Sequence, residues 1–128
     1  MTKRVIQSDK VPAPIGPYSQ AIEANGFVFT SGQIALDAAT GQLIEGGVEE
    51  QTRKVLDNVK AILDAGGIGL NDVVKTTIYL KNISDFSTVN QIYAEYFGES
   101  MPARSTVEVS RLPKDVFIEI DCMALKKE

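Results

Sequence analysis

Two stretches near the end of the chain alternate between apolar and other residues, and they constrain the fold more than any other feature. Between 116 and 125, every second residue is apolar, which gives one unbroken face made of Val116, Ile118, Ile120, Cys122 and Ala124. Between 102 and 109, the same period of two separates Arg104 and Thr106 from Ser105 and Val107. This period is that of a β-strand, whose successive side chains point to opposite faces of a sheet. We therefore expect two strands, connected by a turn at 112–115.

The faces of these two strands opposite their apolar faces suggest a functional site. If the two strands pair directly across the turn, Arg104 and Glu119 project from the same side of the sheet. That side also carries Phe117, Met123 and Leu125, which is an unusual mixture of charged and apolar groups to leave in water. We therefore expect a site on this face that is lined partly by another subunit.

The rest of the chain completes an α+β pattern. Four further strands are predicted at 4–7, 18–24, 27–31 and 72–80, and Asn25-Gly26 is a typical two-residue hairpin turn. Helical spacing of apolar residues predicts helices at 48–65 and at about 84–97, with Ser84 as the N-cap of the second. The expected order is β-β-β-α-β-α-β-β in one domain, residues 1–128. Two helices then cover one face of a mixed six-stranded sheet, and the other face is left for neighbouring copies.

Composition excludes several classes of function. The chain has 128 residues, a net charge of −4 and no long run of Lys or Arg, so nucleic acid is not an expected partner. It has no histidine, which rules out a Ser-His-Asp triad and makes a zinc site in this chain unexpected. Its single cysteine, Cys122, cannot form an internal disulfide and fits a reducing compartment. Without an apolar signal segment or a membrane-spanning run, a cytoplasmic location is the simplest expectation.

Arg104 and Glu119 are the first candidates for chemistry. The planar guanidinium of Arg104 suits two-point binding of a carboxylate, although the residue could instead pair structurally with Glu108 or Glu119. Glu119 lies between Ile118 and Ile120, where loss of solvent would raise the pKa of its carboxyl toward the range useful for proton transfer. A simple ion pair with Arg104 is the alternative for Glu119.

Three residues near the predicted hairpin are further candidates. Tyr18 follows a rigid loop that contains Pro12, Pro14 and Pro17, so its hydroxyl could be placed accurately, or it could be a core tyrosine at a sheet edge. Ser31 and Gly32 could offer a hydroxyl and a backbone N–H to a ligand, or they could form a bulge that ends the hairpin. No histidine can activate Ser31, so a covalent nucleophile is not expected.

Several motifs together resemble the YjgF/RidA family, and the RidA subfamily within it. They are IGPYSQA at 15–21, SGQ at 31–33, DNVK at 57–60, VKTT at 74–77, DFSTVN at 85–90, PARS at 102–105, LPKD at 112–115 and IEI at 118–120. The similarity extends over nearly the whole chain. It differs at Thr106, where many relatives have cysteine.

The resemblance implies a fold and an activity. Family members are homotrimers with a chorismate-mutase-like fold, and their sites lie in clefts between subunits. They hydrolyse 2-imino acids and enamines, such as 2-iminobutanoate and 2-iminopropanoate, to 2-keto acids and ammonia, without metal or organic cofactor. By this resemblance Arg104 binds the substrate carboxylate and Glu119 positions the attacking water. Tyr18 and Ser31 line the pocket, and Gly32, Asn90 and Thr106 lie near the ligand.

Two other functions remain open from the sequence. The same pocket could bind a small carboxylate, such as a 2-keto acid, without turnover. Some family members are described as ribonucleases or translation inhibitors, but the acidic composition and the lack of histidine argue against that activity here. The sequence leaves open which imino acid is preferred and which pathway would be protected.

Overall fold

The computed structural model describes residues 2–126 and has the expected order of elements. The strands are β1 (Lys3–Ile6), β2 (Ala21–Ala24), β3 (Phe27–Thr30), β4 (Val73–Leu80), β5 (Ala103–Glu108) and β6 (Ile118–Leu125). The helices are α1 (Val48–Ala65) and α2 (Phe86–Phe97), with short 3₁₀ turns at Leu70–Asp72, Ile83–Asp85 and Pro113–Asp115. The α+β class, the six-stranded mixed sheet and the bounds of α1 are therefore confirmed.

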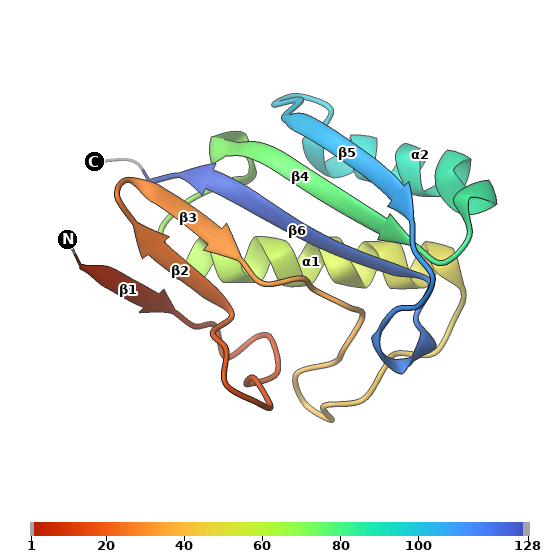
Figure 1. Cartoon of the computed structure of the whole chain (residues 1–128), viewed down its shortest axis with the longest axis horizontal. Helices are drawn as coiled ribbons and strands as arrows, with labels where there is room; N and C mark the ends of the chain where they lie inside the picture. The colour runs from red at the N-terminus through yellow and green to blue at the C-terminus, as the bar shows by residue number, and fades with distance from the viewer. Residues whose placement is uncertain (1, 127–128) are drawn as a thin grey trace.

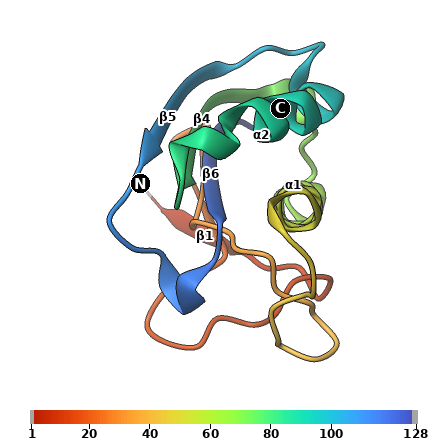
Figure 2. The ribbon, with the colours of Figure 1, turned by 90° about the vertical axis from the view of Figure 1, so that its right-hand side faces the viewer.

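All six strands form one sheet in the order β1-β2-β3-β6-β4-β5. β4 and β5 run parallel, and the other neighbours are antiparallel. Both helices lie against the same face of this sheet, which makes two layers (Figures 1 and 2). The expected direct pairing of the two C-terminal stretches is wrong, because β4 lies between β5 and β6. The connection through Pro113–Asp115 crosses over β4 instead of forming a hairpin.

The register of the three strands at this end of the sheet decides which side chains share a face. Arg104 of β5 is opposite Thr76 of β4, and Thr76 is opposite Cys122 of β6. Tyr79 of β4 is opposite Glu119 of β6. Residues opposite each other in register point to the same face. Arg104 therefore faces the helix layer, whereas Glu119 faces the uncovered side, and the expectation that they project from one side is wrong.

The core lies between the sheet and the two helices. The apolar face of β6 is buried, together with Val116 two residues before the strand; Val116, Ile118, Ile120 and Ala124 are each 0% exposed. α1 contributes a buried stripe of Val55, Leu56, Val59, Ile62 and Leu63, and α2 contributes Val89, Ile92, Tyr93 and Phe97. Cys122 is buried in the same layer, as its position on the apolar face predicted.

The start of α2 differs from the expectation. Ser84 lies inside the 3₁₀ turn Ile83–Asp85, which leads directly into the helix, so it is not the N-cap. Asp85 occupies the cap position with helical backbone angles, and its side chain makes no capping hydrogen bond. The helix therefore begins directly after a 3₁₀ turn, an arrangement that is common at the start of an α-helix.

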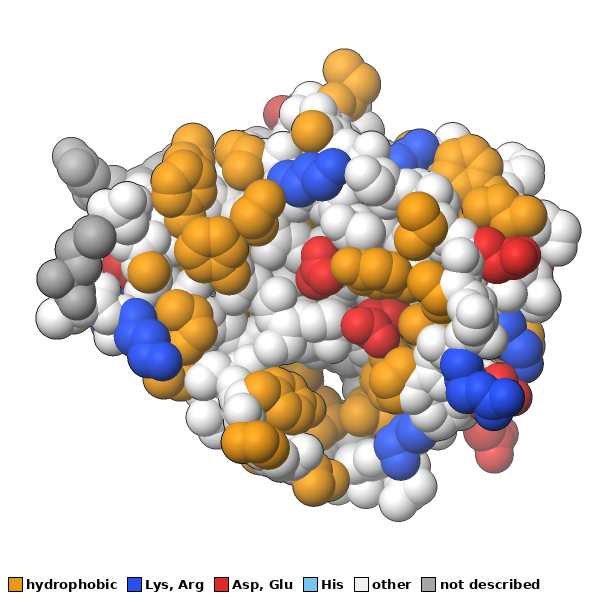
Figure 3. Space-filling model, in the orientation of Figure 1, with side chains coloured by type: hydrophobic (Ala, Val, Ile, Leu, Met, Phe, Trp, Pro, Cys, Tyr) orange, Lys and Arg blue, Asp and Glu red, His pale blue; other side chains and the backbone are white. Residues whose placement is uncertain are grey.

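The face of the sheet away from the helices is apolar at one end and acidic in the middle. Figure 3 views this face, with hydrophobic side chains gathered over the β3 and β6 ends and acidic side chains near the centre. Its exposed apolar residues include Val5, which is 55% exposed, and Phe27, Phe29, Val107, Met123 and Leu125, each 37–46% exposed. Among the described residues, no helix has the length and hydropathy that a membrane span requires.

The turn between β2 and β3 provides a test of the fold. Asn25 and Gly26 both have positive φ, of 54° and 81°, as a type I′ hairpin turn requires. Replacing Gly26 by Ala should lower the free energy of unfolding by about 1 kcal/mol, since an L side chain is strained at this φ. Asn25→Asp is the matched control, because Asp also tolerates this region. Equal chemical-denaturation midpoints for Gly26→Ala and the unmodified protein would contradict the turn assignment.

Candidate functional site

A cleft of about 870 Å³ opens at the start of β6, between two loops. One wall comes from the proline-rich loop before β2, and another from the chain that follows β3 (Figure 1). Pro113 and Lys114 border it near the point where β6 begins. Tyr18, Ser31, Gly32 and Glu119 all line this cleft. Four of the predicted site residues are thus brought together in one hollow, which is visible below the acidic centre of the face in Figure 3.

Glu119 is the one carboxylate that lines the cleft, among the described residues. Its side chain is half-buried, and its carboxylate accepts no hydrogen bond from any residue that the structure describes. Burial raises the pKa of this carboxyl, and the nearby charge of Asp121 raises it further. A carboxyl with a raised pKa that faces a cleft is a candidate for proton transfer. The alternative of an ion pair with Arg104 is wrong, because the two side chains lie on opposite faces.

Gly32 explains how the carboxylate reaches its position. A Cβ atom at residue 32 would lie 1.9 Å from Oε2 of Glu119, so only glycine leaves room for the side chain as it stands. The next residue, Gln33, makes two backbone hydrogen bonds with Ile120, of 2.8 and 3.1 Å. This bridge fixes the chain after β3 against β6, beside Glu119. The group that approaches Gly32 closely is therefore a side chain of the same protomer.

Ser31 and Tyr18 complete this side of the site. The Ser31 hydroxyl donates a hydrogen bond of 2.5 Å to the Ser19 carbonyl, so its oxygen can still accept one from a ligand. Tyr18 is 56% exposed on the loop before β2, so it is not a core tyrosine at a sheet edge. Both residues offer hydroxyl groups near the carboxylate of Glu119.

Buried amide side chains hold the two loops of the cleft, and the sequence reasoning missed them. Gln20, 3% exposed, donates to the carbonyls of Ser8, Val11 and Pro12 and accepts from the Ser8 N–H at 2.7 Å. Asn58 of α1 donates to the carbonyls of Ile34 and Leu36, at 3.3 and 3.1 Å. A polar residue inside an apolar pattern, as at Asn58 within the α1 stripe, is the signal that could have found them.

Arg104 belongs to a second group, on the helix side of the sheet. Its Nη1 donates to Oδ1 of Asn90 at 2.8 Å, and its guanidinium lies over the rings of Tyr93 and Phe86, 4.9 and 5.2 Å from their centroids. It makes no ion pair with any described residue, so the alternative partners Glu108 and Glu119 are both wrong. A planar cation stacked on aromatic rings is held in place while several of its N–H groups stay free to bind an anion.

Thr106 lies on the same face of β5 as Arg104, two residues further along the strand. Its Oγ1 is buried and has no hydrogen-bond partner among the described residues. Asn90, Arg104 and Thr106 thus form one group at the outer edge strand of the sheet. Within one chain, the predicted site residues therefore form two sets. One lies around the carboxylate of Glu119 on the uncovered face, and the other lies around the guanidinium of Arg104 on the helix face.

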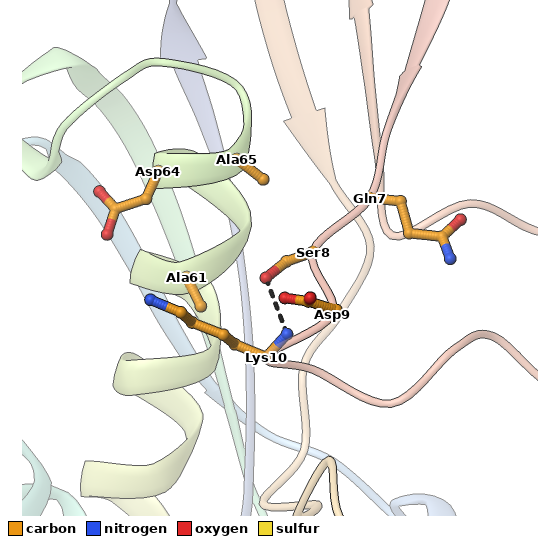
Figure 4. A pocket seen from close by; sticks show the side chains of 7 residues that line it. All are labelled: Gln7, Ser8, Asp9, Lys10, Ala61, Asp64 and Ala65. Carbon is orange, nitrogen blue, oxygen red and sulfur yellow. Dashed lines mark hydrogen bonds between the residues drawn. The ribbon is translucent and has the colours of Figure 1, made fainter.

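A second hollow, of about 640 Å³, lies between the segment after β1 and the C-terminal turns of α1. Figure 4 shows its lining residues, Gln7, Ser8, Asp9, Lys10, Ala61, Asp64 and Ala65, with the Ser8 hydroxyl accepting a hydrogen bond from the Lys10 N–H. The charged side chains in it spread outward to solvent, and it contains none of the predicted site residues. We therefore take the first cleft as the candidate site. Within residues 2–126, no cluster of three or more metal-ligating side chains is present.

The chain matches the family model described as Endoribonuclease L-PSP over residues 8–126. The chain belongs to the YjgF/RidA family. A RutC family protein of Pyrococcus horikoshii is 58% identical, over 98% of this chain and 99% of that protein. The human 2-iminobutanoate/2-iminopropanoate deaminase is 45% identical, over 98% of this chain and 92% of that protein.

Solved structures of the YjgF/RidA family have the same fold. A Thermotoga maritima structure superposes with a TM-score of 0.96 at 49% identity, and covers 99% of this chain and 100% of that one. The structure of E. coli TdcF with bound serine superposes with a TM-score of 0.90 at 40% identity, over 97% of this chain and 99% of that one. The expected family and fold are therefore confirmed.

Replacing Gly32 by Ala tests the contact with Glu119. The new Cβ can be accommodated if the flexible Glu119 side chain moves away, so stability should change by less than about 1 kcal/mol. The carboxyl should then reach solvent, and its pKa should fall toward the ordinary range, as measured by NMR titration of carbon-13-labelled glutamate. Gly69→Ala is the control, since a Cβ there is 4.0 Å from its nearest neighbour. An unchanged Glu119 titration in Gly32→Ala would contradict the contact.

The raised pKa of Glu119 also predicts a pH-dependent stability. The unfolded chain loses this proton at a lower pH than the folded chain, so burial of the charge lowers stability once the pH exceeds the folded pKa. Glu119→Gln should therefore increase the free energy of unfolding at pH 7, by up to about 1 kcal/mol. The gain should disappear below about pH 4, where the carboxyl is protonated in both states. Denaturant melts across this range measure it, and a variant less stable than the parent at pH 7 would contradict it.

Proposed function

We propose that this chain is a hydrolytic deaminase that converts 2-imino acids, including 2-iminobutanoate and 2-iminopropanoate, to 2-keto acids and ammonia. The observation that carries the proposal is the half-buried carboxylate of Glu119, which faces a cleft without a partner among the described residues and has a raised pKa. Relatives from human and mouse, each 45% identical, are named for this reaction. The location we propose is the cytoplasm.

We also propose that the working form is a homotrimer whose sites are shared between protomers. Arg104 and Glu119 lie on opposite faces of one sheet, so a site that uses both needs Arg104 from one protomer and Glu119 from the next. Two features favour such an assembly. β5, which carries Arg104, is an edge strand, and the uncovered face bears the exposed side chains of Phe29, Met123 and Leu125. Repetition of one contact around a threefold axis would close the ring.

The first step of the reaction is binding and orientation. The guanidinium of Arg104, stacked on Tyr93 and held by Asn90, binds the substrate carboxylate through its free N–H groups. Thr106 lies two residues from Arg104 on the same face of β5, and in this proposal its backbone contacts the same ligand. The bound serine in E. coli TdcF, a relative of the same fold, is a small molecule of matching chemistry. Anchoring at the carboxylate brings the imine carbon toward the cleft of Glu119.

The chemical steps then need only water and one carboxyl. The substrate reacts as the iminium, whose nitrogen already carries the extra proton. Glu119 orients a water molecule and accepts one of its protons as the oxygen attacks the carbon, which gives a neutral carbinolamine. The proton on Glu119 then passes to the carbinolamine nitrogen, the C–N bond breaks as the carbonyl forms, and the hydroxyl proton returns to Glu119 and leaves with the ammonia as ammonium. The hydroxyls of Tyr18 and Ser31 line the same cleft and are available to relay these protons, and Gly32 leaves room for the carboxylate. The imine carbon is already electrophilic, so the reaction has no need of an organic cofactor or a metal.

Mixing two inactive variants tests the reaction and the shared site together. Arg104→Ala should lose the anchor and Glu119→Gln the base, so each alone should give almost no acceleration of 2-iminopropanoate hydrolysis. The imine is generated by an amino-acid oxidase, and its lifetime is followed by trapping with semicarbazide. When the two variants are co-refolded in equal amounts, about a quarter of the shared sites should contain both native residues and recover activity. Light scattering checks that each preparation is a trimer.

The controls remove the same charges elsewhere. Arg53→Ala and Glu95→Gln break an exposed ion pair between α1 and α2, of 2.8 Å, and should leave the rate unchanged. If co-refolding restores no activity while the unmodified protein is active, the shared site is wrong. If the unmodified trimer binds 2-keto acids but does not shorten imine lifetime, the chain is a small-carboxylate binding protein and the deaminase proposal fails.

A further inference from the structure

A second carboxylate stands next to Glu119 on the uncovered face of the sheet. Asp121 is two residues further along β6, so the two side chains point to the same side, with their backbones about 7 Å apart. Tyr79 of β4 is opposite Glu119 in register, and its hydroxyl reaches diagonally to donate a 3.1 Å hydrogen bond to Oδ2 of Asp121. Tyr79, Asp121 and Glu119 thus form one cluster, of which only Glu119 lines the cleft.

We propose that Tyr79 and Asp121 are positioning residues for Glu119: the Tyr79 hydroxyl holds the Asp121 carboxylate in place beside Glu119 on the uncovered face, and Asp121 acts there as the charged neighbour of the catalytic carboxyl. The inference rests on the proposed function only for its catalytic consequence. The assignment of the proton within the cluster stands on the geometry of the three side chains.

The hydrogen bond distinguishes the two carboxyls. A carboxylate that accepts a hydrogen bond is stabilised in its charged form, and Asp121 has such a donor while Glu119 has none among the described residues. Burial raises the pKa of both carboxyls, but the Tyr79 hydroxyl acts in the opposite direction on Asp121 alone. Burial and the charge of Asp121 also raise the pKa of Tyr79, so its hydroxyl keeps the proton it donates. As the pH rises, Asp121 is therefore the first to ionise and Glu119 the second.

Within one protomer, the other charged and titratable groups near Glu119 do not replace this effect. Lys81, just past β4, donates from Nζ to Asp115 at 3.1 Å and lies over the Phe117 ring. The Arg104 guanidinium that the proposed trimer brings to the cleft favours ionised Glu119, but it is the same in the parent and in Asp121→Asn and so does not account for a difference between them. Lys114 and Tyr18 border the cleft from its loops, and both are exposed to solvent, which screens them. On the same face of β4, Lys75 is directed to the edge strand, where its Nζ donates to the Ser105 hydroxyl at 2.9 Å. Asp121 is the charged neighbour on the same strand, and it is half-buried beside Glu119.

The catalytic consequence follows from the order of ionisation. A general base works best when its pKa lies near the working pH, because it then binds the water proton strongly and still gives it up. The negative charge of Asp121 raises the pKa of Glu119 and so brings it nearer to the working pH. In the proposed reaction, Glu119 therefore cycles one proton between water and ammonia, while Asp121 touches neither substrate nor water and stays charged.

Asp121→Asn tests this inference in two independent measurements. NMR titration of carbon-13-labelled glutamate in the trimer should show Glu119 losing its proton at a lower pH. The acidic limb of the kcat/KM profile should move the same way, so that activity at pH 5, relative to its plateau, rises about threefold. Asp64→Asn, which removes one exposed carboxylate from α1, is the control and should change neither measurement.

Tyr79→Phe is a second variant that keeps both charges and the ring. Without the hydroxyl, Asp121 should take up its proton at a higher pH, as seen by titration of carbon-13-labelled aspartate. An unmoved Glu119 titration in Asp121→Asn, or an unmoved Asp121 titration in Tyr79→Phe, overturns the inference. If the unmodified protein has no deaminase activity, the proposed function fails, and the two titrations alone decide the assignment of the proton.

Discussion

The position of β4 between β5 and β6 is the constraint on which the rest of the molecule depends. Because β4 pairs with both, Arg104 and Glu119 are not cross-strand neighbours, and the register places them on opposite faces of the sheet. In the proposed deaminase, one protomer therefore contains both halves of the site but cannot join them. The half on the helix side is rigid, since the Arg104 guanidinium is stacked on two rings and bonded to Asn90. The half on the uncovered side is a carboxylate held against Gly32.

Neutral hydrogen bonds keep the second half in place. The loops around the cleft lack regular structure, so their backbone groups need other partners. Gln20 and Asn58 provide them from buried positions, and the Gln33–Ile120 bridge fixes the chain beside Glu119. The amide side chains and backbone groups in these hydrogen bonds do not ionise in the pH range where a carboxyl does. A change of pH therefore leaves these hydrogen bonds in place, while the charge of Glu119 changes beside them. This separation of a fixed frame from one proton-binding group suits acid–base chemistry.

How far the sequence predicts this structure depends on the range of the interactions. The hairpin at Asn25-Gly26, the helix Val48–Ala65 and the buried face of β6 follow from local pattern, and all three were predicted. The strand order does not follow from local pattern, because a short turn between two alternating stretches is compatible both with a hairpin and with a crossover over a third strand. The nature of the site residues was predicted from their motifs, but their distribution over two faces needed the register. The Tyr79–Asp121 pair was missed because its members are distant in sequence.

The same constraint gives the uncovered face its mixed character. A sheet with helices on one side must leave the other side either polar or covered, and here it is neither. Its apolar end, around Phe29 and Met123, exposes hydrophobic surface to water, which is unfavourable. Its centre carries Asp121 and Glu119, and the pKa of each carboxyl is raised. A second copy of the chain resolves both features if its β5 edge meets this face, because it covers apolar surface and brings the cation of Arg104 toward an unpaired carboxylate. The separation of the two groups within one protomer is then the reason why association and the assembly of the site are one event.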